Sequence, residues 1–193
     1  MLLSIFYSII ILLVANSIRK YHKNNKIYVF LLPFVLFKII CAIAFVLIHI
    51  YVYRGGDTFL FFAGGKFIAQ YLLDQPGEFL NLFRLEMSDF QSFTYRNDYS
   101  IIGSFSDPST LFVCQIIALF CFVSFNSFLT ASILFSIAST VGIWLLYSSI
   151  CRIYPNLYKP LAICILFIPT VGIWGSGILK DPVTLSILGI MFY

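Results

Sequence analysis

The charged side chains of this sequence are few, and two short segments hold those whose types could do chemistry. The first segment is Arg54-Gly55-Gly56-Asp57-Thr58, and the second runs from Trp174 to Pro182 and contains Lys180-Asp181. A carboxylate that follows two glycines can turn back over a neighbouring surface, because glycine permits tight turns and close approach of a ligand. Such a carboxylate can serve as a general base or a metal ligand, and a lysine beside one can bind phosphate.

Both segments also have a purely structural interpretation. Asp57 has the residue type of an N-cap for a helix that follows it, and its spacing favours that role. Lys180 and Asp181 could mark the boundary of an interfacial helix, with Asp181 as its cap and Pro182 in its first turn. Position alone leaves the two interpretations of Lys180-Asp181 equal.

The composition indicates whether the chain is surrounded by water or by lipid. Apolar residues make up 61% of the chain and charged residues 10%, with a mean hydropathy of +0.97. A soluble domain carries roughly 25% charged residues because its surface meets water. We therefore exclude a soluble domain and expect an all-α, polytopic transmembrane helix bundle, with an outer-face loop that carries amphipathic interfacial helices.

The apolar stretches predict where helices enter the bilayer. They cover residues 2–17, 27–53, 128–150 and 161–174, with the start of another at 183–193, and a short stretch at 110–125. A span needs about 20 apolar residues. The last stretch is too short to cross, so we expect residues 1–193 to form one transmembrane domain that is truncated.

The distribution of charge predicts the topology. Arg19, Lys20, Lys23 and Lys26 follow the first stretch, which predicts a retained helix with its N-terminus outside and its basic end in the cytoplasm. The outer loop, residues 54–108, carries four basic and seven acidic residues, a charge of −3. That balance places the loop outside.

Residues 110–125 allow two topologies. If they span the bilayer, Arg152 and Lys159 lie outside and Asp181 lies on the opposite side from Asp57. If they re-enter, Arg152 and Lys159 are cytoplasmic, and Asp57, Lys180 and Asp181 share the outer surface. We favour re-entry, because it obeys the positive-inside rule at both basic clusters and accounts for the shortness of the stretch.

Other residues have simpler interpretations. Residues 57–74 predict a surface helix with a polar stripe at Lys66, Gln70 and Asp74, although Gly64-Gly65 weakens that prediction. Lys38 lies within a span and either lines a polar cavity, pairs with another helix or snorkels to the interface, unless the span starts later than residue 27. We expect His49 to be packed or interfacial, and the five cysteines to be small packing residues.

The two segments together resemble the GT-C class of polytopic glycosyltransferases, such as protein O-mannosyltransferases and lipid A aminoarabinose transferases. Gly56-Asp57 with the following helix resembles the first outer loop of that class, which holds an essential acidic residue. Residues 168–181, ending in Lys180-Asp181, resemble a later outer loop that ends in a second aspartate. The resemblance covers roughly residue 53 to the end and corresponds to the N-terminal part of such an enzyme, after one additional helix.

The resemblance implies a function and roles for four residues. A sugar would move from a polyprenyl-phosphate donor to an acceptor at the outer face. Asp57 would be the catalytic base or a metal ligand, and Lys180 with Arg54 would bind the donor phosphate. Asp181 would position the lysine, the acceptor or a metal. No cofactor is certain, and a divalent cation on Asp57 and Asp181 is a candidate. The loop at 76–108 would contact sugar.

Two other functions remain open from the sequence. A transporter or flippase-like protein would explain Lys38 and an interrupted helix near residues 174–182. A non-catalytic subunit would need a membrane partner to complete its bundle. The expected partners are the bilayer, the lipid-linked donor and such a polypeptide, without nucleic acid. The expected location is a bacterial inner (cytoplasmic) membrane, crossed several times.

Overall fold

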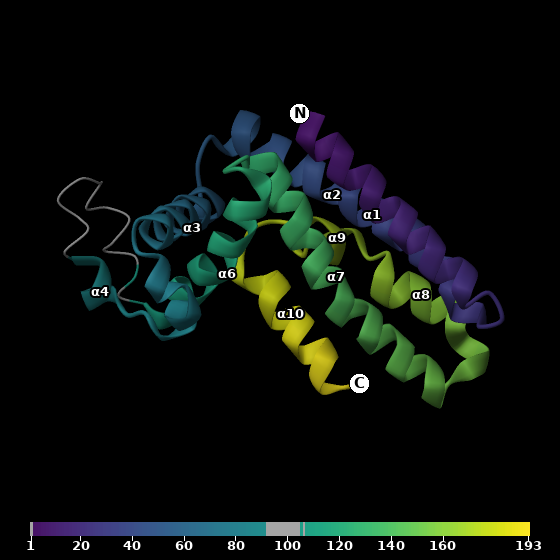
Figure 1. The fold of residues 1–193 in the computed structure, drawn as a ribbon. Coiled ribbons are helices and arrows are strands. Elements are labelled where there is room, and N and C mark those ends of the chain that lie inside the picture. Colours follow the sequence, from purple (N-terminus) through teal and green to yellow (C-terminus); the bar gives the residue numbers. More distant parts are fainter. Residues whose placement is uncertain (1, 92–104, 106) are drawn as a thin grey trace.

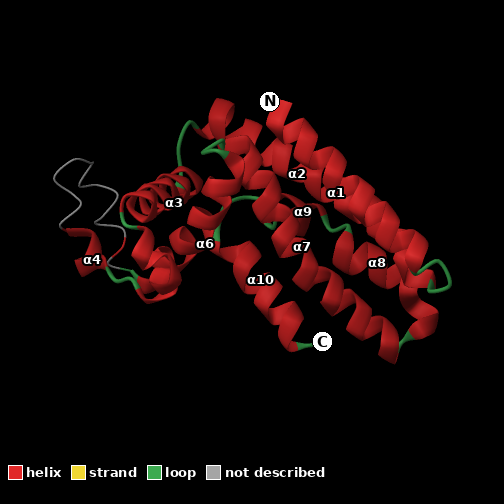
Figure 2. Cartoon of the chain, in the orientation of Figure 1, coloured by secondary structure: helices red, strands yellow, loops and turns green. Residues whose placement is uncertain are grey.

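A computed structural model describes residues 2–91, 105 and 107–193 of this chain, and all regular secondary structure in that part is helical (Figure 2). The predicted all-α class is therefore confirmed. The five cysteines are all free, and four of them are buried, in keeping with a packing role.

Three long helices form the main bundle (Figure 1). Each is long and apolar enough to cross a membrane, which suggests an integral membrane protein. They are α1 (Leu2–Tyr21), α2 (Leu31–Ile48) and α7 (Phe128–Ile153). A 3-10 turn, η1 (Lys26–Phe30), precedes α2, and a π-helical turn, η2 (His49–Tyr53), follows it. His49 stacks on Phe45 at 4.0 Å and is buried, as expected.

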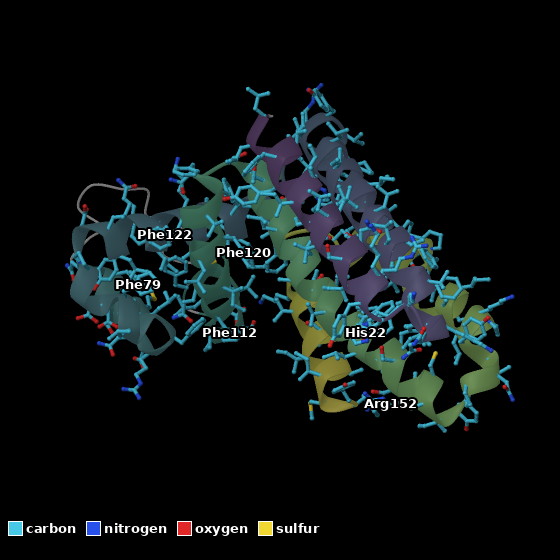
Figure 3. The ribbon with its side chains drawn as sticks, turned by 45° about the vertical axis from the view of Figure 1, so that its right-hand side comes forward. His22, Phe79, Phe112, Phe120, Phe122 and Arg152 are labelled. Atoms are coloured by element: carbon cyan, nitrogen blue, oxygen red, sulfur yellow. The ribbon has the colours of Figure 1, made fainter. Side chains whose placement is uncertain are left out.

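The two basic clusters lie at one end of this bundle. The hydroxyls of Ser4 and Thr130 are 2.9 Å apart, so α1 and α7 begin at the same end and also finish together. Figure 3 shows His22, which follows α1, and Arg152, near the end of α7, in the same lower part of the view, and Lys26 and Arg152 line one cavity. Arg152 thus lies at the same end as the basic residues after α1, and the side of a membrane that this end faces stays a prediction.

A separate lobe lies beside the bundle. It consists of α3 (Asp57–Asp74), η3 (Pro76–Arg84), α4 (Met87–Gln91) and α6 (Pro108–Ser124). Figure 1 shows α3 almost along its axis while α7 is seen from the side, so α3 runs across the bundle. The predicted bounds of α3 are confirmed, and its polar stripe of Lys66, Gln70 and Asp74 is exposed.

The 110–125 stretch is one uninterrupted helix, α6, so the chain does not double back within it. It packs against α3, and the two glycines that weakened the helix prediction allow that packing. A Cβ on Gly64 would lie 2.6 Å from the sulfur of Cys114, and one on Gly65 would lie 2.7 Å from Cβ of Ile117. Close helix approach, rather than a turn, explains this glycine pair.

The stretch at 161–174, which we predicted as one span, is not one continuous helix. The chain forms two short helices there, α8 (Tyr158–Leu166) and α9 (Pro169–Trp174). Proline has no N–H to donate and disfavours helical geometry in the residue before it, and Ile168 is extended with ψ 121°.

The last helix, α10 (Lys180–Met191), returns to the basic end. Arg152 donates to the hydroxyl of Tyr193 at 2.6 Å, so the end of α10 lies beside the end of α7. Gly142 of α7 faces Ser186 and Gly189 of α10 at a distance that leaves no room for a Cβ. Residues 158–193 therefore enter the bundle and leave it at the same end.

We predict that Gly65→Ala lowers the free energy of unfolding by about 1–3 kcal/mol, because the added methyl overpacks the α3–α6 contact. The alanine's better helix propensity, about 1 kcal/mol, offsets part of this cost. Thermal unfolding of the detergent-solubilised protein measures the effect. Gly77→Ala is the control, because a Cβ there meets nothing within 4 Å and should leave the unfolding temperature unchanged.

Candidate functional site

The interruption between α9 and α10 lies inside the bundle, and Lys38 holds it there. The side-chain nitrogen of Lys38 donates to the carbonyl of Gly175 at 2.5 Å, and the hydroxyl of Ser139 donates to the same oxygen at 3.1 Å. Lys38 is 1% exposed. Of the predicted alternatives for Lys38, contact with another segment is correct and snorkelling is wrong.

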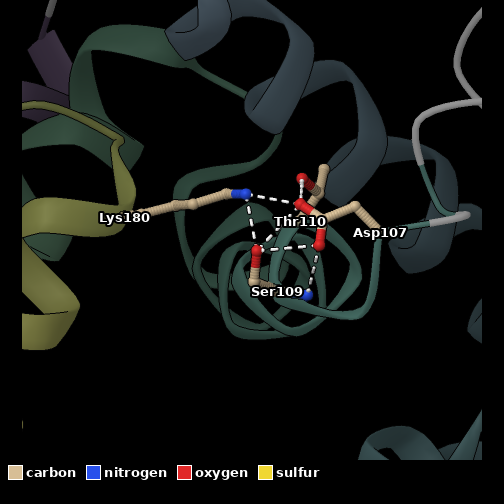
Figure 4. A network of polar contacts seen from close by, with 4 residues as sticks. All are labelled: Asp107, Ser109, Thr110 and Lys180. Carbon is tan, nitrogen blue, oxygen red and sulfur yellow. Dashed lines mark hydrogen bonds and ion pairs between the residues drawn. The ribbon is translucent and has the colours of Figure 1, made fainter.

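After this interruption, Lys180 opens α10 and reaches toward the lobe (Figure 4). Its ammonium is 2.6 Å from Oδ2 of Asp107 and donates to the hydroxyl of Ser109 at 2.6 Å. The Lys180 side chain is 39% exposed and that of Asp107 is 51% exposed. The pair is therefore open to a ligand that competes for the lysine.

Asp107 is positioned by the start of α6, where it is the N-cap. It accepts from the backbone N–H of Ser109 at 3.2 Å and from the hydroxyl of Thr110 at 2.7 Å. The Lys180 ammonium, followed by the two hydroxyls, holds the pKa of Asp107 well below its ordinary value. Asp107 is therefore ionised at neutral pH.

Lys180 also contacts α3, the helix whose first turn holds the predicted base, Asp57. The Lys180 ammonium is 5.9 Å from the centroid of the Phe61 ring on α3. Asp57 and Phe61 are four residues apart, so they share a face of α3 and are separated by a rise of roughly 6 Å. The structure thus brings Lys180 of α10 to Asp107 at the start of α6 and to Phe61 of α3, one helical turn from Asp57.

The cap role that spacing favoured for Asp57 is wrong. Gly56 is the N-cap of α3, with φ 112°, a conformation that suits glycine, and Asp57 is in the first turn with its side chain exposed. Next to it, the Thr58 hydroxyl is buried and has no hydrogen-bond partner in the described part of the chain. Arg54 is exposed after η2, in a left-handed conformation.

Asp181 does not join this corner. It is not the cap of α10 either, because Leu179 occupies that position. Consecutive residues on a helix point about 100° apart, and Asp181 instead lines a cavity of about 510 Å³ with residues of α9 and α10, including Trp174. The carboxylate that holds Lys180 is Asp107, so the predicted positioning of the lysine by Asp181 is wrong.

The described residues do not fit a metal centre. Among residues 2–91, 105 and 107–193, no three His, Cys, Asp or Glu side chains are grouped as metal ligands. Asp57 and Asp181 also face different neighbours, because the cavity lined by Asp181 includes no residue of α3. A cation held by this pair of carboxylates is therefore not supported by their placement.

A polar cavity of about 600 Å³ lies in the lobe. Its lining offers carboxylates, an amide, a guanidinium and hydroxyls: Tyr71, Glu78, Asn81, Arg84, Leu85, Ser88 and Asp89. All of these residues except Tyr71 of α3 belong to the loop that we predicted to contact sugar. The rest of that loop, at 92–104 and 106, lies outside the described residues.

Sequence reasoning missed the role of Asp107, although a signal was present. Asp107-Pro108-Ser109 precedes an apolar run, and an aspartate followed by proline is a typical start of a helix. That pattern predicts the cap. The partner of its other oxygen, Lys180, lies 73 residues away and could not be inferred from spacing.

Comparison with known proteins gives no family: no protein family model, no curated protein and no solved structure matches this chain. The geometry of the corner and of the cavities is therefore the basis for any functional conclusion.

We predict that Lys180→Gln raises the pKa of Asp107 toward its ordinary value, because the largest cause of the depression is removed. When folding lowers a carboxyl pKa, the contact stabilises the folded protein at pH values above the ordinary pKa. This stabilisation is lost as the pH falls through the pKa of the folded state. Carboxyl ¹³C NMR titration in detergent micelles measures the shift. Lys159→Gln, at the opposite end, should leave the Asp107 titration unchanged.

Proposed function

We propose that this chain is the N-terminal, membrane-embedded part of a glycosyltransferase that moves a sugar from a polyprenyl-phosphate donor to an acceptor at the outer face. One observation carries the proposal: the half-exposed Lys180 lies against Phe61, one helical turn from Asp57. A cation for the donor phosphate and a carboxylate base for the acceptor are thereby within reach of one substrate.

In the proposed chemistry, the charged side chains of Lys180 and Asp57 are in position before the substrate binds. Lys180 offsets the negative charge that grows on the departing polyprenyl phosphate, and preformed electrostatic stabilisation is usually the largest contribution to such a step. Asp57 accepts the proton of the acceptor hydroxyl as the new glycosidic bond forms. Before the donor binds, Asp107 holds the lysine in place, and the donor phosphate competes with Asp107 for it.

The surroundings suit a substrate that is part lipid and part sugar. The exposed apolar surface of the bundle can receive a polyprenyl tail, and the polar lobe cavity offers amide and carboxylate groups to a sugar. Arg54 follows η2, close in sequence to Asp57, and is proposed as a second cation for the phosphate. In this proposal the corner faces outward and the basic end faces the cytoplasm of a bacterial inner membrane.

The test is Asp57→Asn in the full-length protein, reconstituted with a polyprenyl-phosphate sugar carrying a radiolabel. We expect transfer to fall by about 100-fold or more, because general base catalysis contributes 10²–10⁴. The amount of protein in the membrane should not change. Asp74→Asn is the matched control at the other end of α3, and should transfer normally. Normal transfer by Asp57→Asn would end this proposal.

A transporter or flippase-like function is the second candidate, and a specific contact favours it. Lys38 lies within the candidate span at 26–53 and donates to a backbone carbonyl at the break between α9 and α10. Discontinuous helices build the substrate sites of many transporters, where free backbone carbonyls bind ions or solutes.

For this candidate we predict that the unaltered protein moves a fluorescent lipid across the membrane of reconstituted vesicles without hydrolysing a sugar donor. Lys38→Gln is expected to abolish this movement. Glutamine keeps an N–H donor on a side chain one bond shorter than that of lysine, so folding of the variant is checked by thermal unfolding. Lys66→Gln, on the exposed stripe of α3, is the control. Unaltered movement in a folded Lys38→Gln protein rules out a transport role for this lysine.

A further inference from the structure

The largest cavity described in the molecule lies at the basic end, away from the corner that holds Asp57. We call it the basic-end cavity; its volume is about 660 Å³, within the range of small-ligand sites. It is bounded by the loop after α1, the final turns of α7 and the start of α8. Its lining includes Asn24, Lys26, Trp144, Ser148, Arg152 and Asn156.

The groups that face this cavity are mainly hydrogen-bond donors. Lys26, Arg152 and the Trp144 indole can only donate. The side chains of Asn24, Ser148 and Asn156 can also donate, and the structure gives none of the three a hydrogen-bond partner within the described residues. Arg152 alone is partly engaged, by Tyr193. The arrangement leaves several donors for an incoming acceptor.

No acidic residue balances these cations. The lining includes no aspartate or glutamate, and all eight acidic residues of the chain lie at positions 57–107 or at 181. A second cavity, of about 250 Å³, shares Asn25 and Tyr28 with the first and adds Arg19, Lys20 and Lys23. The electrostatic field at this end therefore favours an anion, and phosphate oxygens match its donors.

We propose that the basic-end cavity binds the phosphate headgroup of an anionic membrane lipid. Free phosphate shares the headgroup chemistry, but the position of the cavity favours the lipid. It opens where α1 and α7 end and α2 begins, which is the level of lipid headgroups for helices that cross the bilayer. Tyr28, Trp144 and Tyr158 line it, and aromatic rings of this kind are enriched at that interface. Basic pockets between helix ends bind such headgroups.

Trp144 supplies a reporter inside the cavity. The chain has two tryptophans, so Trp174→Phe leaves Trp144 as the single source of indole fluorescence. The full chain is placed in phosphatidylcholine nanodiscs that contain either brominated phosphatidylglycerol or brominated phosphatidylcholine as quencher. We expect phosphatidylglycerol to quench Trp144 at lower content than phosphatidylcholine.

Variants separate the cavity from general surface attraction. Lys26→Gln and Arg152→Gln should each weaken the phosphatidylglycerol preference by about fivefold or more. Asn156→Asp changes no volume and adds a carboxylate, so it should abolish the preference even if Arg152→Gln folds poorly. Lys159→Gln is the matched control, because Lys159 is a cation at the same end that does not line the cavity, and it should retain the preference.

Three results would overturn the proposal. Equal quenching by the two lipids shows that the headgroup is not recognised. An equal loss in Lys159→Gln and Lys26→Gln shows that surface charge alone attracts the lipid. If inorganic phosphate alone changes Trp144 fluorescence in phosphatidylcholine nanodiscs, and Asn156→Asp removes that change, the ligand is a soluble phosphate. This cavity is remote from Asp57. The proposed sugar transfer and the lipid binding proposed here can therefore each fail without the other.

Discussion

The hydrogen bonds to the Gly175 carbonyl are the interaction on which the arrangement depends. A chain that breaks its helix among apolar side chains leaves backbone carbonyls without partners, and burying such a group unpaired is costly. Lys38 from α2 and Ser139 from α7 both donate to this one oxygen. The break between α9 and α10 is therefore attached to two long helices, and α10 begins from that attached point.

The direction of α10 decides where Lys180 can act. Because α10 starts inside the bundle and packs along α7, its first residue faces the lobe, where Asp107 caps α6. The lobe is closely packed at this point, since Gly64 and Gly65 leave room on α3 for the side chains of Cys114 and Ile117 of α6. A lysine, a capping carboxylate and the face of α3 that holds Asp57 thus converge from three separate elements.

Charge divides the molecule into two unlike regions. The acidic residues that the structure describes belong to the lobe and to the start of α10, whereas the basic-end cavity has cations with no aspartate or glutamate side chain among its lining residues. The lysine in the lobe corner already has an anionic partner, so a ligand there must displace a carboxylate. At the basic end the donors have no such competitor. The two regions therefore offer a ligand different electrostatic conditions.

The sequence by itself determined the class of the protein and its local structure. Hydropathy and length identified the helices that could cross a membrane, and the period of Lys66, Gln70 and Asp74 predicted the exposed stripe of α3. Such features depend on neighbouring residues and on the solvent, both of which are readable along the chain. Pro169 was readable too, but its effect on the predicted span at 161–174 was underestimated.

Only the tertiary structure decided which charges meet. Lys180 pairs with Asp107 and not with its neighbour Asp181, because a helix turns consecutive side chains about 100° apart. Likewise, the contact of Lys38 with Gly175 joins residues 137 positions apart. Contacts of this separation depend on how helices cross, and crossing is set by small residues at packed faces, whose partners no local pattern reveals.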